Sequence, residues 1–370
     1  MAASPTDLPA KMVPALPRYR HVSETQEILE WAYVPLIDFS MLHSEGGTAK
    51  LVSQVRDAMR TYGFICIINH GLMQAQNDRM MDIADVPFTQ VPLEEQRKFV
   101  SRIKDLGEYK GYKPLRSWHI ENGVHDQVDQ YMVIPPTFKQ DHPKPLVPFL
   151  PEIRSFMEHN HFKVLHPLLK LLALGLELPE NTFVDQHRYQ AEGKKFVCFS
   201  KYYPRSDSDE EKTKNVWMKG HTDGGTVSLL WSQPIIALQL MSPDGNWRYV
   251  QHVPNGIIVN LGDAMEMLSG GYYKAAIHRV FQPPSDQRGY PRLGLFYFAY
   301  TDDDVRLVPY EESPVLQRVG IRRQCDDKDA PTMKEWSIIR ATLYGNSETT
   351  RQDDGMEVQM VDGLVIKHWN

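Results

Sequence analysis

The stretch of sequence that decides the fold opens with His221-Thr222-Asp223 and closes with Arg292-Leu293-Gly294. Between these motifs, short apolar runs alternate with Pro, Gly, Asn and Asp, and His278 lies inside one of the runs. Many short strands at such spacing are typical of a β sandwich or barrel. His221 and Asp223 share one face if the chain is extended, because alternate residues of a strand point the same way. A barrel would then bring the distant His278 close to the pair.

Two neutral imidazoles and one carboxylate form a ligand set that suits non-haem Fe(II) and leaves coordination positions open. A His-x-Asp tripeptide is weak evidence by itself, because composition alone predicts it about once in a chain of this length. Most histidines are exposed or satisfied within a core. The surroundings favour the metal interpretation, since His221 to Gly225 leads straight into an apolar strand and His278 lies in another.

Arg292 precedes an apolar run, and as part of a strand it would share a face with Gly294, Phe296 and Phe298. An arginine inside a barrel requires a carboxylate, and its planar guanidinium suits a two-point contact. The alternatives are a local ion pair or an outward-pointing side chain. Arg279 is a rival for the same role; Arg288, also a rival, lies in a polar turn and is expected in solvent.

Runs of apolar residues predict the other elements. We expect a short strand over 34–39, an amphipathic helix over 48–60 and a fully buried strand over 64–68. Helical structure is expected over 73–100, interrupted near Pro87 and Pro92, and over 151–178, kinked or split at Pro167. Residues 105–125 have little periodicity and suggest a long functional loop. Further strands are expected at 196–203, 226–231, 237–241, 247–252, 256–261, 275–281 and 293–300.

The predicted fold class is therefore mainly β with flanking helices. We divide the chain into an N-terminal arm (1–30), an N-terminal region of helices and edge strands (31–150), a catalytic core (151–305) and a C-terminal helix and hairpin (306–370). The hairpin prediction rests on Asp362-Gly363, which separates two apolar runs at 356–361 and 364–368. We expect the arm to be poorly ordered or to form a short surface helix.

The composition argues against a nucleic-acid-binding protein, a membrane protein and a disulfide-rich secreted protein. The net charge is −6 and no basic stripe is present, so a nucleic-acid partner is not expected. The mean hydropathy is −0.44, and without a long apolar run or a secretory signal a soluble, cytoplasmic protein is expected rather than a membrane protein. The three cysteines are odd in number and far apart, which favours free thiols in a reducing compartment.

The order of five motifs resembles the isopenicillin N synthase-like family of Fe(II)/2-oxoglutarate-dependent oxygenases, particularly its fungal small-molecule branch. The motifs in this chain are Tyr202-Tyr203-Pro204, His221-Thr222-Asp223, Asn260 to Asp263, Tyr273 to Val280, and Arg292-Leu293-Gly294. The segments 34–39 and 63–71 resemble the family's N-terminal region. Consistency across so many motifs is far more specific than any single one.

The resemblance implies a double-stranded β-helix, or jelly roll, with iron held by His221, Asp223 and His278. It implies that 2-oxoglutarate binds the iron and that its distal carboxylate meets Arg292, with Tyr203 and the backbone near Gly294 alongside. Cosubstrate and O2 would yield succinate and CO2 while a small metabolite is hydroxylated, desaturated or cyclised, in keeping with secondary metabolism. Ascorbate is a further candidate cofactor, and the resemblance leaves the oligomeric state open.

Two departures from the family pattern stand out. Gly294 occupies the place where the family usually has a hydroxyl residue, and Lys201 the place where it often has an amide. Gly294 keeps open a second hypothesis, an oxidase of the isopenicillin N synthase type that needs no 2-oxoglutarate. A third hypothesis is a non-catalytic binding module on the same fold.

Aromatic side chains suggest an apolar or aromatic small-molecule substrate, although such residues fill cores more often than they contact ligands. Arg116 could instead bind a substrate carboxylate, or form a surface ion pair. The candidate pocket residues are Tyr112, Arg116, Trp118, Tyr131, Trp231, Phe296 and Phe298.

Overall fold

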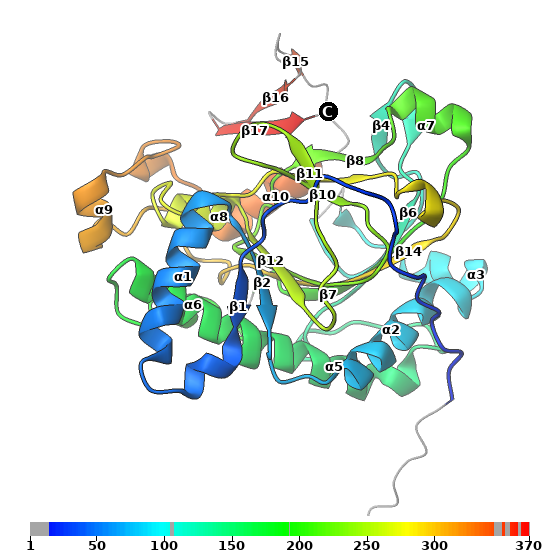
Figure 1. The fold of residues 1–370 in the computed structure, drawn as a ribbon, viewed down its shortest axis with the longest axis horizontal. Helices are drawn as coiled ribbons and strands as arrows, with labels where there is room; N and C mark the ends of the chain where they lie inside the picture. The colour runs from blue at the N-terminus through cyan, green and yellow to red at the C-terminus, as the bar shows by residue number, and fades with distance from the viewer. Residues whose placement is uncertain are drawn as a thin grey trace, which may run out of the picture.

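The computed structural model describes residues 15–103, 107–191, 193–343, 350–351, 356–361 and 364–369, and from residue 342 onward it describes the backbone alone. Two β-sheets face each other and enclose the interior, and helices flank them (Figure 1). This arrangement is the predicted jelly roll. No helix in the described ranges is long and apolar enough to cross a membrane.

The larger sheet has the strand order β1-β2-β12-β9-β14-β7-β6-β3. Its central strands come from the predicted core, while the N-terminal region supplies both edges. All pairs are antiparallel except that of β1 with β2. The strands are β1 (Leu36–Asp38), β2 (Phe64–Ile68), β3 (Gly111–Lys113), β6 (Val128–Val133), β7 (Phe196–Tyr202), β9 (Val227–Trp231), β12 (Ile257–Leu261) and β14 (Arg292–Ala299).

The second sheet has the order β11-β10-β13-β8-β17-β16-β15. Its members are β8 (Val216–His221), β10 (Leu238–Met241), β11 (Trp247–Tyr249), β13 (His278–Phe281), β15 (Thr350–Arg351), β16 (Met356–Val361) and β17 (Leu364–Trp369). The predicted C-terminal hairpin is present as β16 and β17, and β17 pairs with β8 at Gly220. β4 (His119–Glu121) and β5 (Val124–His125) form a separate two-stranded sheet that contacts β8 and α7 (Asp207–Thr213).

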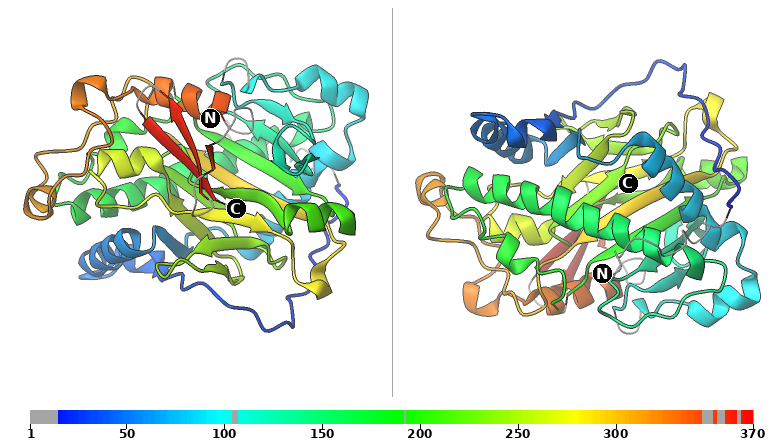
Figure 2. Two further views of the ribbon diagram at one scale, coloured as in Figure 1. Left: turned by 90° about the horizontal axis from the view of Figure 1, so that it is seen from above. Right: turned by 90° about the horizontal axis from the view of Figure 1, so that it is seen from below.

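Helices of the N-terminal half cover the outer face of the larger sheet (Figure 2). Helix α2 packs on β7 and β14, and α1 packs on α6. The main helices are α1 (Gly47–Thr61), α2 (Gln74–Thr89), α3 (Leu93–Gln96), α5 (Leu150–His159) and α6 (His166–Gly175), followed by α7 (Asp207–Thr213), α8 (Asp263–Leu268), α9 (Pro314–Val319) and α10 (Met333–Leu343).

Two prolines behave differently from each other. Pro87 lies inside α2, which continues to Thr89, so the predicted interruption there was wrong. Near Pro167 the expected kink or split takes the form of a π-helical turn at Asn160–Leu165, which joins α5 to α6 without leaving the helical conformation, and Pro167 lies in the first turn of α6. Proline is tolerated in a first helical turn, where its missing N–H would have no partner.

Residues 15–30 form neither the expected surface helix nor a detached arm; we call this segment the strap. The strap is extended and hydrogen-bonds to the turn that precedes β14. Thr25 Oγ1 donates to Asp286 at 2.8 Å, and Gln287 Nε2 donates to the Ser23 carbonyl at 2.8 Å. Farther along, the Tyr249 amide donates to the Glu30 carbonyl at 2.9 Å. The strap therefore holds the connection that leads to Arg292.

Candidate metal centre and cosubstrate site

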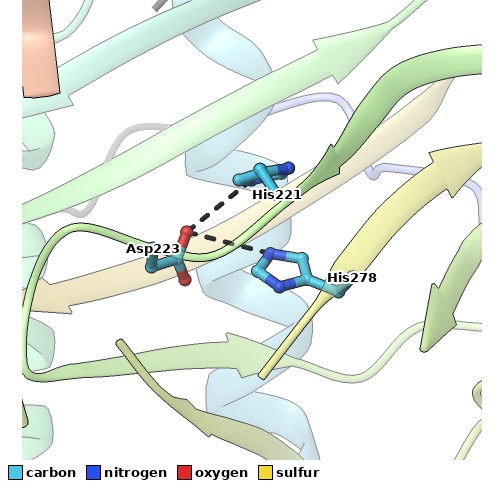
Figure 3. Close-up of side chains that lie close together, drawn as sticks. All are labelled: His221, Asp223 and His278. Carbon is cyan, nitrogen blue, oxygen red and sulfur yellow. Dashed lines mark ion pairs between the residues drawn. The ribbon is translucent and has the colours of Figure 1, made fainter. Parts of the chain in front are cut away.

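His221, Asp223 and His278 converge on one point at the inner side of the smaller sheet (Figure 3). His221 ends β8 and His278 begins β13, and the two residues are direct register partners of these antiparallel strands. One ligand atom from each of the three residues lies within 4.8 Å of the others. Asp223 Oδ1 is 3.7 Å from His221 Nε2 and 3.8 Å from His278 Nε2.

The hydrogen bonds of the two histidines suit metal binding. His221 Nδ1 lies 2.8 Å from the Lys219 carbonyl and His278 Nδ1 lies 3.0 Å from the Ala276 carbonyl. A carbonyl can only accept, so each Nδ1 carries a proton, and each Nε2 is left as the ring atom that can bind a metal. Burial, reinforced by the neighbouring His278, lowers the pKa of His221, which keeps this ring neutral at pH 7.

The two carboxylate oxygens of Asp223 have different partners. Ser228 Oγ donates to Oδ2 at 2.6 Å, and Asn260 Nδ2 donates to the same oxygen at 2.7 Å. Oδ1 remains directed at the two imidazoles. Burial opposes ionisation, but the adjacent histidines and these hydrogen bonds lower the pKa of Asp223 overall. The three side chains thus present two imidazole nitrogens and one anionic oxygen, which fits a divalent iron ion.

A cavity of about 170 Å³ extends from these three residues into the barrel. Its walls are mainly apolar and aromatic, and Arg292 forms part of its lining. The Arg292 side chain is 4% exposed, and its Nε lies 3.4 Å from the Ile235 carbonyl. Within the described ranges no carboxylate forms an ion pair with Arg292, and burial lowers its pKa. A buried guanidinium without a counter-charge is suited to an anionic ligand.

Two family models match the chain. One, described as non-haem dioxygenase in morphine synthesis N-terminal, matches residues 34–151, and that of the 2OG-Fe(II) oxygenase superfamily matches residues 195–299. The 2-oxoglutarate-Fe(II) type oxidoreductase hxnY of Emericella nidulans is 30% identical over 292 residues, which are 73% of this chain and 80% of that protein.

The chain belongs to the 2OG-Fe(II) oxygenase superfamily.

Other relatives of this oxygenase include the 2-oxoglutarate-dependent dioxygenase citB of Monascus ruber, 26% identical over 336 residues, which are 85% of this chain and 96% of that protein. Among solved structures, a full-length Neurospora crassa protein in complex with alpha-KG has a TM-score of 0.69 at 19% identity, covering 84% of this chain and 96% of that one. JOX2 in complex with 2OG, Fe and JA has a TM-score of 0.66 at 20% identity, covering 88% and 90%. At these identities the structural likeness shows the fold alone.

Family membership settles the class of reaction. The protein is a 2-oxoglutarate-dependent dioxygenase that uses Fe(II) and 2-oxoglutarate and acts on a small molecule. Nothing in the comparisons supports the alternatives of an oxidase that needs no 2-oxoglutarate or of a non-catalytic binding module.

The tyrosine beside Arg292 is Tyr202, not the expected Tyr203. Tyr202 is the register partner of Arg292, and its ring centroid lies 5.9 Å from the guanidinium carbon. Neighbouring residues of a strand point to opposite faces, so Tyr203 faces away from the cavity. Lys201 shares that outer face and forms an ion pair of 2.6 Å with Asp85 of α2. Lys201 therefore fastens the helix to the sheet and does not reach the cosubstrate site.

The structure separates the candidate substrate residues into two groups. Trp118, Phe296 and Phe298 line the cavity. Four others do not line it. Arg116 is exposed, and Tyr112, Tyr131 and Trp231 are buried elsewhere with hydrogen bonds of their own, to the Pro87 carbonyl (2.9 Å), His142 (2.8 Å) and Asn160 (3.1 Å) respectively. The reason is again that successive residues of a strand point to opposite faces. Gln130 and Leu230 face the cavity, so Tyr131 and Trp231 face the helices.

Several cavity residues were not predicted from the sequence. The N-terminal region contributes Ile103, Tyr109, Gln130 and Met132 to the cavity lining. Among the described residues none forms a hydrogen bond to the Gln130 amide, which makes it a polar group available to a ligand. The alternating pattern of β6 could have identified Gln130, but only once the inward face of that strand was known.

Proposed function

We propose that His221, Asp223 and His278 hold the Fe(II) and that Arg292 binds the distal carboxylate of 2-oxoglutarate. The observation that carries the proposal is the cluster of two Nε2 atoms and one carboxylate oxygen at one cavity that also contains a buried arginine without a counter-ion among the described residues. When bound, iron and 2-oxoglutarate together supply O2 activation, with succinate and CO2 as coproducts.

The residues of the chain position and shield these groups. The carbonyls of Lys219 and Ala276 orient the two imidazoles, while Ser228 and Asn260 fix Oδ2 of Asp223. The mainly apolar and aromatic walls provide surroundings of low polarity, which strengthen the contact between the buried Arg292 and a carboxylate. Such a preset arrangement reduces the rearrangement needed when ligands bind.

We further propose that the substrate is a small, uncharged, apolar or aromatic metabolite. Trp118, Tyr109, Phe298 and Tyr300 line the cavity, and Gln130 provides one amide for a polar group of the substrate. Arg340 is the other arginine in the lining, and it is already occupied by an ion pair with Asp263 at 3.5 Å. An anionic substrate therefore has no obvious counter-charge of its own. We also propose a role in secondary metabolism and a cytoplasmic location; the free, buried thiols of Cys66 and Cys198 support the latter.

The test combines metal binding with product formation. Calorimetric titration with Fe(II) under anaerobic conditions should show one site in the wild type and none in His278→Ala. Succinate should form only when Fe(II), O2 and 2-oxoglutarate are all present, and faster when a neutral aromatic metabolite from a screen is accepted. His125→Ala, at an exposed position away from the cavity, is the control and should behave as wild type. Equal Fe(II) affinity in His278→Ala and wild type would overturn the assignment.

A further inference from the structure

Ser200 carries a buried hydroxyl whose role the fold does not explain. Its side chain is 0% exposed, and Oγ has no hydrogen-bond partner among the described residues. Leaving a buried polar atom unsatisfied costs about 1–3 kcal/mol, so native proteins rarely do so without a functional reason. Other buried polar atoms of the described residues also lack partners, so the position of Ser200 decides whether its hydroxyl can meet a ligand.

The position of Ser200 relates it to the cosubstrate site. In the antiparallel pair β7 and β14, Ser200 is the register partner of Gly294, and the next inward pair along is Tyr202 with Arg292. Directly opposed residues project from the same face, and alternate residues keep that face. Cys198, Tyr202 and Arg292 of these strands all line the cavity. Ser200 therefore projects on the cavity side, diagonally across from Arg292.

Gly294 leaves the space that the Ser200 hydroxyl occupies. A Cβ atom at residue 294 would lie 2.7 Å from Ser200 Oγ and 2.6 Å from Cε2 of Phe296. Both distances are too short for a real contact, so any side chain at 294 would displace one of the two groups. The hydroxyl of Ser200 and the ring of Phe296 thus share the place where a side chain of residue 294 would project.

We propose that Ser200 donates a hydrogen bond to the distal carboxylate of 2-oxoglutarate beside Arg292. The hydroxyl comes from the neighbouring strand β7, and Gly294 is the residue that makes room for it. This proposal rests on the proposed role of Arg292 and adds a second residue at the same carboxylate.

The experiment measures ligand affinity, not turnover. Calorimetric titration of the anaerobic Fe(II) protein with 2-oxoglutarate should show about tenfold weaker binding in Ser200→Ala, as expected for loss of one hydrogen bond to a charged group. Ser200→Thr retains a hydroxyl and should bind within about twofold of wild type by the same argument. Pyruvate has the same 2-oxo acid group but no distal carboxylate, so its affinity, measured by competition, should not change in Ser200→Ala.

A rescue variant tests whether a hydroxyl at residue 294 can replace that of Ser200. Gly294→Ser with Phe296→Ala, introduced together into Ser200→Ala, places a hydroxyl at residue 294 and removes the ring that blocks it; this triple variant should recover most of the affinity for 2-oxoglutarate. Equal weakening for pyruvate and 2-oxoglutarate in Ser200→Ala would reveal a merely structural role and overturn the proposal.

The Arg292→Met variant distinguishes a wrong role for Ser200 from a wrong position for the carboxylate site. If Arg292→Met loses 2-oxoglutarate binding while Ser200→Ala binds as wild type does, the role of Ser200 is wrong and that of Arg292 stands. If Arg292→Met also binds 2-oxoglutarate normally, the assigned carboxylate site itself is wrong.

Discussion

At the scale of single residues, Asp223 is the side chain on which the geometry of the metal centre depends. One of its oxygens is held by Ser228 and Asn260, and this leaves the other oxygen directed at the two imidazoles. Both of these partners follow from strand register, because Ser228 and Asn260 are opposed residues of β9 and β12. Two residues of the larger sheet therefore orient Asp223, which follows strand β8 of the smaller sheet.

Removal of the Asn260 amide should weaken iron binding without unfolding the protein. Asn260→Ala deletes one of the two donors to Asp223 Oδ2, so the carboxylate can rotate away from its ligating orientation. Residues that orient metal ligands typically contribute about 10–100-fold in affinity. Anaerobic titration with Fe(II) should show a loss at the lower end of this range. Asn181→Ala, at an exposed position, serves as the control, and an unchanged Fe(II) affinity in Asn260→Ala would contradict the prediction.

Which tyrosine faces Arg292 could not be decided from sequence, and the reason is physical. All seven residues of β7 are buried, since helices cover one face and the cavity lies on the other. Apolar and aromatic residues consequently occur on both faces, and no polar alternation reveals the inward one. The same ambiguity affected Tyr112, Tyr131 and Trp231. The three candidate iron ligands were easier to identify because their residue types and spacing are themselves a chemical signal.

At the scale of elements, α10 is tied to the loop that carries Asp223. Trp336 Nε1 donates to the Gly224 carbonyl at 2.9 Å, and the Arg340 guanidinium donates to the Thr222 carbonyl. Arg340 also pairs with Asp263 at the start of α8. Loops that bind ligands are commonly mobile, and these bonds hold this one in place.

Trp336→Phe should loosen this loop. The substitution keeps most of the buried ring but removes the N–H, so the Gly224 carbonyl loses its partner at a cost of about 1–3 kcal/mol. We expect a fall of several degrees in the midpoint of thermal unfolding, measured by circular dichroism, and weaker Fe(II) binding. Saturating Fe(II) should restore part of the lost stability, because a ligand that binds only the folded state stabilises it. An unaltered midpoint would show that the bond contributes nothing.

The strap suggests a second experiment at this scale. Gln287 is 1% exposed and links the strap at Ser23, the Pro234 carbonyl and the Ile236 amide to the turn that precedes Arg292. Gln287→Ala leaves these backbone groups unpaired and frees the turn. We expect a several-fold rise in KM for 2-oxoglutarate with a smaller change in kcat, because Arg292 loses its fixed position. Gln317→Ala, on the exposed face of α9, should leave KM unchanged, and a Gln287→Ala variant with wild-type KM would refute the link.

Strands with an unbroken apolar run were easier to predict than short strands or strands with polar residues. Residues 64–68 and 257–261 form strands almost where their apolar runs predicted, because turn residues bound each run. Strand β8 was not predicted, because Val216 to His221 contains a lysine, a glycine and a histidine and so lacks the pattern of a strand. Residues 105–125 were expected to form a loop, yet they include β3, β4 and β5, whose brevity gives little periodicity to detect.

At the scale of the whole molecule, a group of buried histidines connects the helices to the larger sheet. His161 Nδ1 lies 2.8 Å from the Tyr297 hydroxyl, and its other nitrogen lies 3.1 Å from His166. His187 lies 2.7 Å from Thr226 Oγ1. Burial, with the nearby His166, lowers the pKa of His161 to about 3, and burial lowers the pKa of His187 to about 4.

These shifts predict acid sensitivity. The unfolded chain binds protons at these histidines below about pH 6.5, whereas the folded protein resists protonation until about pH 4 or 3. The stability they provide is complete above pH 6.5 and decreases as the pH falls toward the folded values, by up to about 1.4 kcal/mol per pH unit for each group. Urea denaturation at pH 7.5, 6.5 and 5.5 should show this slope. His161→Gln should have a shallower slope, and an identical slope would exclude His161 as a cause.

The order of strands in the larger sheet has a consequence for how the protein reaches its native state. The central strands β12, β9, β14 and β7 come from the second half of the chain, whereas β1 and β2 border them on one side and β6 and β3 on the other. Neither half can complete this sheet without the other, so most of its pairings join residues far apart along the polypeptide. Such topologies fold slowly and leave unpaired strand edges exposed on the way. Expression of residues 195–299 as a fragment should accordingly give aggregates, and production of the intact enzyme should benefit from low temperature and added chaperones.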